Sequence, residues 1–279
     1  MELIRSVRSM QEAALTVKRS ARRIALVPTM GALHEGHVAL IRAAQNRGAA
    51  VVVSIYVNPA QFAPHEDFKQ YPRDLDGDLA VCRREGVDVV FAPTDEEMYA
   101  TDASTWVTES LIAKRLEGER RPHFFRGVCT VVSKLFLICQ PDVAVFGQKD
   151  YQQWKVIQRM VRDLNFPVEI IAVPTVREPD GLACSSRNRY LDPLERAQAT
   201  VLYKALLVAR DLFNQGEFNA HRLASAMIRA IELAPSARLD YAEVADGETL
   251  MPRSEVRRGD VALVAAYIGK TRLIDNLVL

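Results

Sequence analysis

Cysteines are few in this sequence, and they lie far apart from one another. Only four occur among 279 residues, and no C-x-x-C pair is present. This spacing argues against a zinc ribbon or a thiol–disulfide motif. Two of the cysteines lie in apolar stretches, so we predict reduced and mostly buried thiols. The four residues are Cys82, Cys129, Cys139 and Cys184.

Long apolar runs and an excess of one charge are also missing. No stretch reaches the roughly eighteen apolar residues of a membrane-spanning helix. The first 20 residues mix charges and lack the apolar core of a signal peptide. The 36 basic and 35 acidic residues leave a formal net charge of +1, which gives no overall field for nucleic acid or a membrane. We therefore expect a cytoplasmic protein whose partners include neither nucleic acid nor a membrane.

The chain is long enough for a substantial core in one or two domains. Strand-like runs at 24–27, 49–56, 87–91, 143–146 and 168–173 alternate with helical stretches near 38–44, 75–85, 131–139 and 151–164. Pro28 marks the end of the first run. Such alternation predicts β-α-β units and a parallel sheet. We predict an α/β fold with a Rossmann-like domain over residues 1–175.

The composition changes after Val176, where a polar loop precedes a helix with a strong start signal. Asp192 as N-cap, Pro193 at the first helical position and Glu195 at the third fit a capping box. A further helix near 220–233 and strand-like runs near 239–244, 261–267 and 273–277 follow. We predict a smaller α+β domain with antiparallel strands over residues 176–279.

Two histidines stand three residues apart where the first strand gives way to a helix. The segment 28–37 reads PTMGALHEGH, and the spacing puts His34 and His37 on one face of the helix start. Gly31 and Gly36 allow close backbone approach to a ligand. We expect the first helical turn to present unpaired N–H groups and the positive end of the helix dipole, which together stabilise a bound anion. The pattern favours a phosphate site.

Other interpretations of the histidine pair compete with a phosphate site. A metalloprotease-type zinc site needs histidines at i and i+4, and the i, i+3 spacing here argues against it. For the nearby acidic cluster of Asp74, Asp76 and Asp78, a solvated helix start is favoured over a magnesium contact. We predict no protein-held metal. The histidines also suit simple helix capping without any function.

The H-x-G-H pattern is similar to the signature of the nucleotidylyl-transferase superfamily. Its members activate a carboxylate or a phosphate on the α-phosphate of a nucleotide. Class I aminoacyl-tRNA synthetases share this signature, but they also need a tRNA-binding module. No part of this sequence is distinctly basic, so the tRNA interpretation is disfavoured.

Polar residues also follow two other predicted strands. In open α/β sheets, ligands bind beyond the carboxyl ends of the strands. Asn58 and Gln61 follow the 49–56 run, and a primary amide can bond a small polar substrate, although Asn-Pro also starts ordinary turns. Lys149 follows the 143–146 run and is placed to meet nucleotide phosphates. Asp150 and Gln153 fit either a capping box or contacts with nucleotide and substrate.

Two more polar loops give weaker signals. Ser185, Ser186 and Arg187 supply two hydroxyls and a guanidinium between the predicted domains. This composition suits closure over a triphosphate, and an ordinary exposed loop explains it equally well. The basic and aromatic segment 121–127 is also predicted to be a loop, and an ordinary surface location of Arg121 and His123 is favoured over substrate contact.

Five segments together resemble the pantoate–β-alanine ligase family. They read PTMGALHEGH, NPAQF, FGQKDYQQ, PTVREPDGLACSSRNRYL and TRLIDN. They occur in the family's order, and the resemblance spans nearly the whole chain. It implies an ATP-dependent ligase in which the carboxylate of (R)-pantoate attacks the α-phosphorus of ATP, giving pantoyl adenylate and pyrophosphate. The amine of β-alanine then displaces AMP to form pantothenate.

The resemblance also implies which residues bind ATP. The implied set is Met30, Gly31, Ala32, Leu33, His34, Glu35, Gly36, His37, Gly147, Gln148, Lys149, Asp150, Val176, Cys184, Ser185, Ser186 and Arg187. Family members often have methionine where Cys184 stands and glutamate where Gln148 stands. This departure weakens any side-chain assignment there, and Cys184 keeps its backbone for contact with the adenine.

The remaining roles follow from the same resemblance. His34, His37 and Lys149 are implied to be catalytic, with His37 as proton donor. Gln61 and Gln153 are implied to bind pantoate, and Gln61 also lies near β-alanine. The resemblance implies Mg²⁺ with the ATP, a nucleotide- and pantoate-binding domain over residues 1–175, a lid domain over 176–279, and a homodimer formed through the larger domain.

Two further function classes stay open from the residues. A nucleotidylyltransferase that uses a substrate phosphate would need a basic pocket, whereas the proposed pocket offers the neutral amides of Gln61 and Gln153. A nucleotide-sensing module without turnover would not need His34, His37 and Lys149 together.

Overall fold

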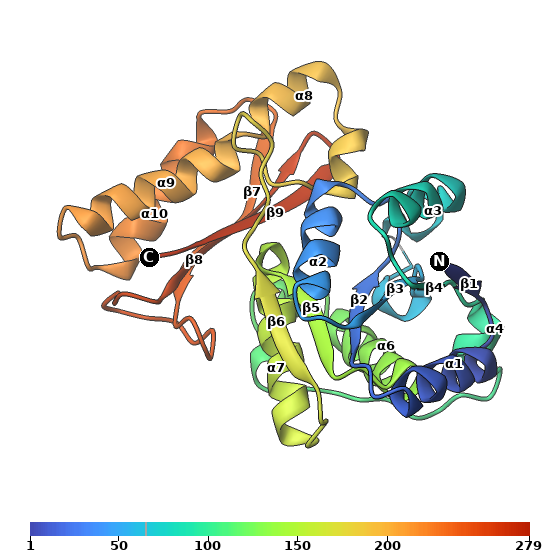
Figure 1. The fold of residues 1–279 in the computed structure, drawn as a ribbon. Coiled ribbons are helices and arrows are strands. Elements are labelled where there is room, and N and C mark those ends of the chain that lie inside the picture. The colour runs from blue at the N-terminus through green and yellow to red at the C-terminus, as the bar shows by residue number, and fades with distance from the viewer. Residues whose placement is uncertain (65) are drawn as a thin grey trace. The chain divides into compact units, whose positions relative to one another are not determined.

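The computed structural model describes residues 1–64 and 66–279. The chain divides into two compact units. The first unit comprises Met1–Gln148 and Gln152–Pro174, and the second comprises Lys149–Tyr151 and Thr175–Leu279 (Figure 1). The short Lys149–Tyr151 segment thus groups with the C-terminal part, although the residues on both sides of it belong to the first unit.

A six-stranded parallel sheet forms the centre of the first unit. Its strand order is β1-β4-β3-β2-β5-β6, and every pairing is parallel. The strands are β1 (Glu2–Ile4), β2 (Ile24–Thr29), β3 (Ala50–Ile55), β4 (Val89–Phe91), β5 (Val143–Gly147) and β6 (Glu169–Val173). The predicted α/β fold with a parallel sheet is confirmed, and β1 is an additional edge strand that the sequence pattern did not indicate.

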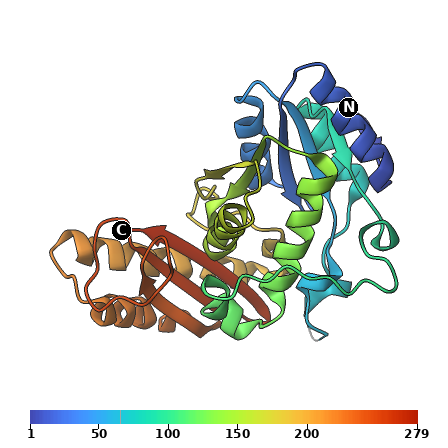
Figure 2. The ribbon, with the colours of Figure 1, turned by 90° about the horizontal axis from the view of Figure 1, so that it is seen from below.

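Helices connect these strands and cover the sheet. They are α1 (Val7–Arg19), α2 (Glu35–Gln45), α3 (Leu75–Arg84), α4 (Asp95–Met98), α5 (Glu117–Arg120), α6 (Phe124–Cys139) and α7 (Tyr151–Asp163). Short 3-10 helices lie at η1 (Pro59–Gln61), η2 (Asp67–Lys69), η3 (Ile112–Lys114) and η4 (Gln148–Asp150). Figures 1 and 2 show α2 and α1 on opposite sides of the strands.

Alternate strand residues face α2 and α3 and form a buried apolar cluster. From β2, Ala25 and Val27 join this cluster, because successive strand side chains point to opposite faces of a sheet. Ile41 of α2 and Cys82 of α3 pack against them, and all four side chains are 0% exposed. The loops that leave the carboxyl ends of β2 and β3 therefore start from a rigid, fully packed layer.

Strand β2, predicted at 24–27, extends two residues beyond its predicted end. Pro28 pairs with Ser54 in register, and β2 ends at Thr29 rather than before the proline. The carbonyl of Thr29 accepts a hydrogen bond from Tyr56 N on the β3 side. The backbone groups of the preceding residue, Pro28, therefore face the opposite neighbour, β5. The β2–β5 pairing ends at Leu26, and the missing N–H of Pro28 therefore breaks no ladder bond.

The helix predicted at 131–139 begins earlier, at Phe124. The basic and aromatic segment 121–127 was predicted to be a loop, but its second half forms the first turn of α6. Gly127 lies against η1, where a Cβ atom would stand 2.2 Å from the carbonyl oxygen of Ala60. Close packing of α6 on η1 therefore requires glycine at this position.

The second unit is a three-stranded antiparallel sheet packed against helices. Its strand order is β7-β8-β9, with β7 (Ala237–Ala245), β8 (Val261–Ile268) and β9 (Thr271–Val278). The helices are η5 (Ser186–Tyr190), α8 (Pro193–Gln198), α9 (Val201–Asn214) and α10 (Ala220–Glu232). The predicted capping box of Asp192 and Glu195 is present at α8, and α9 is a separate helix that the sequence pattern did not resolve.

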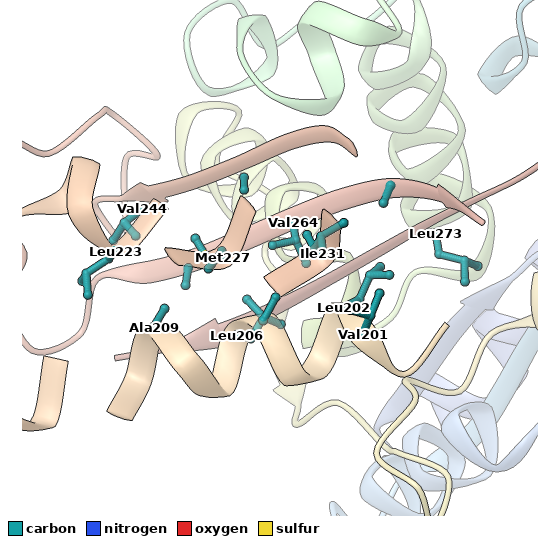
Figure 3. Close-up of a cluster of buried hydrophobic side chains, with 14 of the residues drawn as sticks. Val201, Leu202, Leu206, Ala209, Leu223, Met227, Ile231, Val244, Val264 and Leu273 are labelled. Atoms are coloured by element: carbon teal, nitrogen blue, oxygen red, sulfur yellow. The ribbon is translucent and has the colours of Figure 1, made fainter. Parts of the chain in front are cut away.

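The core of the second unit lies between α9, α10 and the sheet. Figure 3 shows Leu202 and Leu206 of α9, Met227 of α10 and Val264 of β8 within this cluster. All four side chains are at most 1% exposed. No helix in the described part of the chain is both long enough and apolar enough to cross a membrane.

Candidate active site

The loop between β2 and α2 is held by hydrogen bonds from its own chain. The hydroxyl of Thr29 donates to the carbonyl of Ser54 at 2.7 Å and accepts from the N–H of Gly31 at 3.1 Å. Gly31 and Ala32 have φ values of +82° and +52°. Glycine adopts this left-handed region readily, but alanine does so only with strain, so other contacts must hold the turn at Ala32.

Asp78 of α3 supplies those contacts. Its carboxylate accepts hydrogen bonds from Ala32 N at 2.9 Å and from Leu33 N at 2.7 Å. The Asp78 residue is only 4% exposed. The prediction of a solvated helix start was therefore wrong for Asp78. It holds for Asp74, which is exposed and caps α3 by accepting from Gly77 N at 3.0 Å.

His34 and His37 form a reciprocal cap at the start of α2. His34 Nδ1 accepts from Gly36 N at 3.1 Å, and His37 Nδ1 accepts from His34 N at 3.3 Å. The ring centroids are 4.2 Å apart. The capping interpretation of these histidines is therefore confirmed, whether or not they also bind a ligand.

The expectation of an open helix N-terminus at α2 is met only at Glu35, whose N–H makes no hydrogen bond to the described residues. The N–H groups of Ala32, Leu33, His34 and Gly36 all donate to protein side chains, and that of His37 donates to the carbonyl of His34. In the first turn of α2, the N–H of Glu35 is therefore the backbone donor that the described residues leave for an anion. Binding would depend on this donor, on the imidazoles and on other cations.

The same contacts fix the tautomer of both neutral rings. A ring nitrogen that accepts a hydrogen bond carries no proton, so the proton of each neutral imidazole is on Nε2. The loop thus provides two Nε2–H donors from rings in contact with each other. This pair is suited to a ligand rich in oxygen acceptors, such as a polyphosphate.

Asn58 orients the side-chain amide of Gln61. Asn58 Nδ2 donates to Gln61 Oε1 at 2.9 Å and to the carbonyl of Gly127 at 3.2 Å. Asn58 Oδ1 accepts from Tyr99 Oη at 2.9 Å and from Ala60 N at 3.3 Å. All hydrogen-bonding capacity of the Asn58 amide is therefore used, and the residue is 1% exposed.

Gln61 has a side-chain NH₂ group to which the described residues give no hydrogen-bond partner. Its Oε1 accepts from Asn58, so Nε2 is the remaining donor, and it makes no hydrogen bond to residues 1–64 or 66–279. The Gln61 residue is 8% exposed. A nearly buried donor of this kind favours a ligand with an oxygen acceptor.

Two tyrosine hydroxyls are bonded within the first unit, that of Tyr99 to Asn58 and that of Tyr56 to Asp95. Burial raises the pKa of Tyr99 to about 12, so its hydroxyl stays protonated and can donate to Asn58. Burial also raises the pKa of Tyr56 well above its usual value, and the hydrogen bond to the Asp95 carboxylate adds to this. Both phenols are therefore neutral hydrogen-bond donors at physiological pH.

Arg121 is a partly buried clamp, in contrast to its predicted surface location. Its guanidinium bonds the Glu66 carboxylate at 2.5 and 2.9 Å and the carbonyl of Gln61 at 3.1 Å. It also stacks on the Phe124 ring, 3.8 Å from the centroid. The Arg121 side chain is 14% exposed. It therefore fixes the main chain at Gln61.

Gln152 and its neighbour Gln153 differ in their surroundings. The Gln152 amide accepts from Glu117 N at 3.0 Å and donates at 2.8 Å to the carbonyls of Ile112 and Arg115. The residue is 3% exposed and holds the turn that precedes α5. The side chain of Gln153 is half-buried and makes no hydrogen bond within the described parts of the chain, so it stays a candidate for ligand contact.

In the second unit, Lys149 is held through its main chain. Asn276 Nδ2 donates to the Lys149 carbonyl at 2.8 Å, and Tyr151 Oη donates to the carbonyl of Gly247 at 2.9 Å. Lys149 Nζ lies 3.9 Å from the Asp150 carboxylate. Asp150 is thus paired with Lys149, and the proposed capping box with Gln153 is not formed.

The loop before α8 is also ordered by local contacts. Cys184 N donates to the carbonyl of Val176 at 2.9 Å, so this N–H is already used within the loop. A backbone contact of Cys184 with an adenine stays a prediction. The hydroxyl of Ser185 accepts from Arg187 N at 3.3 Å and caps η5. Ser186 is 8% exposed.

Arg177 and Asp275 anchor this loop to β9. The guanidinium bonds the carboxylate at 2.6 and 2.9 Å and stacks on Tyr203, 3.7 Å from the ring centroid. It also donates to the carbonyls of Gly181 and Asn276. The arrangement links the segment around Val176 to the strand that holds Lys149.

The predicted site residues therefore fall into separate groups. His34 and His37 contact each other, Gln61 contacts Asn58, and these groups follow the carboxyl ends of the adjacent strands β2 and β3. Within the described residues, no group of three or more His, Cys, Asp or Glu side chains is arranged to hold a metal ion.

Sequence reasoning missed three supporting residues. Asp78 and Tyr99 act on partners more than 40 residues away in sequence, which leaves no local pattern. Gln152 stands in the recognised QKDYQQ run, but its three backbone partners lie at 112–117. In each case the signal depends on the tertiary fold.

Known proteins resemble the chain over its full length. A family model described as "Pantoate-beta-alanine ligase" matches residues 2–278. The pantothenate synthetase of Thermotoga neapolitana is 50% identical over 279 residues, which cover 100% of both chains. That of Salinibacter ruber is 51% identical over 285 residues, covering 99% of this chain and 97% of the relative.

Solved structures give the same result. The crystal structure of pantothenate synthetase from Thermus thermophilus has a TM-score of 0.94 at 46% identity, covering 100% of this chain and 99% of that one. The pantoate-beta-alanine ligase of Francisella tularensis, complexed with beta-gamma ATP and beta-alanine, has a TM-score of 0.82 at 33% identity. The match covers 100% of this chain and 97% of that one.

Proposed function

The chain belongs to the pantoate–β-alanine ligase family, and from that premise we propose how its residues carry out the ATP-dependent condensation of (R)-pantoate with β-alanine. In the first step, a carboxylate oxygen of pantoate bonds to the α-phosphorus of ATP. The bond from this phosphorus to the bridging oxygen breaks, and pyrophosphate leaves with the electron pair. In the second step, the β-alanine nitrogen bonds to the acyl carbon, loses a proton and displaces AMP.

The observation that carries the proposal is the histidine pair at the end of β2. His34 and His37 use Nδ1 for capping, which leaves Nε2–H as the donor of each neutral ring. We assign these donors to the ATP phosphates, with His37 as proton donor. Positioned donors stabilise the charge that develops on phosphate oxygens during attack.

We assign pantoate to Gln61 and Gln153. The Nε2 donor of Gln61, oriented by Asn58, is suited to the carboxylate or a hydroxyl of pantoate, and Gln61 also lies near β-alanine in this assignment. A neutral amide suits a single carboxylate better than a phosphate. This difference favours carboxylate activation over transfer to a substrate phosphate.

The remaining ATP contacts come from loops that follow strands. We assign Lys149 to the phosphates as a catalytic cation. The other members of the assignment are Met30, Gly31, Ala32, Leu33, Glu35, Gly36, Gly147, Gln148, Asp150, Val176, Cys184, Ser185, Ser186 and Arg187. For Ala32, Leu33 and Gly36 the contact would not be through the N–H, since these groups bond protein acceptors.

The proposal has four further parts. Mg²⁺ binds together with ATP, and we assign it no protein ligand and derive no step through it. Residues 1–175 bind nucleotide and pantoate, and residues 176–279 act as a lid domain. The protein is cytoplasmic. It forms a homodimer through the larger domain, which analytical ultracentrifugation would test.

Isotope exchange between pyrophosphate and ATP tests the adenylate route. We expect exchange with (R)-pantoate and Mg²⁺ in the absence of β-alanine, because the first step is then reversible by itself. Exchange that requires β-alanine would contradict a free-standing adenylation step. Exchange with a phosphorylated acceptor in place of pantoate would instead support a nucleotidylyltransferase.

A further inference from the structure

Asp78 connects two parts of the first unit that are distant in sequence. It lies in the first turn of α3, while its hydrogen-bond partners Ala32 and Leu33 lie in the loop that leads to His34. The residue is 4% exposed. A carboxylate this deeply buried needs specific partners, because an unpaired buried charge is strongly unfavourable.

The two N–H groups that Asp78 receives belong to a strained turn. Gly31 and Ala32 have consecutive positive φ values, and the N–H groups of Ala32 and Leu33 that follow donate to one carboxylate. Asp78 Oδ2 accepts from Ala32 N and Asp78 Oδ1 accepts from Leu33 N. These two N–H groups are therefore not available to a phosphate, and the bonds to Asp78 compensate for the strain at Ala32.

The fit between the loop and Asp78 also explains the glycine at position 31. A Cβ atom at Gly31 would stand 2.8 Å from Asp78 Oδ2 and 3.1 Å from Ile55 Cγ2. Any side chain there would push the carboxylate away from the two N–H groups. Gly31 is thus required by the aspartate as well as by its own φ of +82°.

The position of the loop determines where the histidines stand. Leu33, which donates to Asp78, directly precedes His34, the N-cap of α2. The His34 N–H in turn donates to Nδ1 of His37. A shift of the loop at Leu33 would therefore move both imidazoles.

We propose that Asp78 is a positioning residue for adenylation: by holding Ala32 N and Leu33 N, it places the Nε2–H donors of His34 and His37 against the phosphates of ATP. The inference rests on the proposed function, since it assumes that the histidines contact the nucleotide. Asp78 itself contacts neither ATP nor pantoate in this assignment.

The test compares Asp78→Asn with Asp76→Asn. The asparagine is nearly isosteric, but it presents an NH₂ group to one of the two loop N–H groups and leaves that donor unsatisfied. Asp76 is exposed on the same helical turn and serves as a matched control. We expect Asp78→Asn to slow pantoate-dependent pyrophosphate–ATP exchange by on the order of 10–100-fold, and Asp76→Asn to leave it unchanged.

A second readout separates positioning from loss of folded protein. Supplied pantoyl adenylate and β-alanine allow the second step to be measured without the first. A decrease in the folded fraction lowers both rates equally, whereas displaced histidines lower the exchange rate more than the aminolysis rate. Equal losses in both steps would overturn the inference.

Asp78→Glu keeps the charge and both acceptor oxygens but adds one methylene. We expect the unfolding midpoint of Asp78→Glu to be closer to that of the wild type than the midpoint of Asp78→Asn is. Exchange should stay slow in Asp78→Glu, because the longer side chain holds the loop in a displaced position. Wild-type exchange in either Asp78 variant would overturn the inference while leaving the proposed function intact. Absence of exchange in the wild-type chain would instead overturn the proposed function and the inference with it.

Discussion

His34 combines helix capping with a proposed role in phosphate binding, and one substitution can separate the two. Asparagine is among the best N-cap residues, so His34→Asn keeps an acceptor for Gly36 N while it removes the imidazole. We expect stability close to that of the wild type and exchange slowed about a hundredfold, the typical cost of losing one oriented donor to the reacting group. Thermal unfolding and pyrophosphate–ATP exchange measure the two effects.

His34→Ala is the companion variant, because it removes both the cap and the imidazole. We expect it to lose about 1 kcal/mol of stability through the missing cap and to be as slow as His34→Asn. If His34→Asn exchanged at the wild-type rate, the imidazole would have no role beyond capping.

A substitution at Gln61 can test whether its Nε2 donates a hydrogen bond to pantoate. In Gln61→Glu, one carboxylate oxygen still accepts from Asn58 Nδ2, but the other replaces the Nε2 donor with a negative acceptor. We expect the KM for pantoate to rise at least tenfold, because the new charge repels the substrate carboxylate. The KM for ATP, measured in the same assays, serves as the internal control. An equal rise in both constants would contradict a specific pantoate contact.

Packing between α6 and η1 connects a helix to the orientation of Gln61. The carbonyl of Gly127 accepts from Asn58, and a Cβ atom at this position would meet the Ala60 carbonyl oxygen at 2.2 Å. We expect Gly127→Ala to cost about 1–3 kcal/mol of stability through overpacking and to raise the KM for pantoate. Urea unfolding and steady-state kinetics measure both.

Leu137→Ala on the same helix provides the control for Gly127→Ala. Leu137 is 64% exposed, so we expect its stability to change by no more than about 0.5 kcal/mol and the KM for pantoate to stay constant. A Gly127→Ala variant that behaved like this control would show that α6 can move away from η1 without cost.

Periodic elements were predictable from the sequence, and long-range contacts were not. The runs at 24–27 and 143–146 and the cap at Asp192 depend on local patterns, and the structure contains them. The first turn of α6 was missed, because the arginine, proline and glycine of segment 121–127 are typical of a loop. The histidine cap was one of the alternatives, but nothing local showed that it would occupy the helix N–H groups.

The division of the whole chain was also only partly visible in the sequence. A change of composition near Val176 is a local signal, whereas the grouping of Lys149–Tyr151 with the second unit depends on contacts to Gly247 and Asn276. These partners lie 96 and 127 residues further along the chain. The assignment of Lys149 to the phosphates was made from its neighbours in sequence and stays a prediction, whereas its structural support could not be predicted from them.

Across the whole chain, the four thiols differ in burial. Cys82, Cys129 and Cys139 are free and 0% exposed, as predicted for most of the cysteines. Burial raises the pKa of Cys82 to about 11 and that of Cys129 to about 12, and it raises the pKa of Cys139 further. Their thiolate forms are therefore scarce at neutral pH, and only Cys184 is partly exposed.

A thiol reagent should therefore modify one cysteine quickly in the native protein and all four in denaturant, because thiolates are the reactive form. Cys184→Ser should abolish the fast reaction and is the control. If ATP covers this loop as proposed, MgATP should slow labelling of Cys184 in proportion to the occupied fraction of the site. The loop is ordered by local contacts such as that of Cys184 N with Val176, so bound ATP should cover Cys184 in a fixed position. If saturating MgATP left the labelling rate unchanged, Cys184 would not be one of the nucleotide contacts.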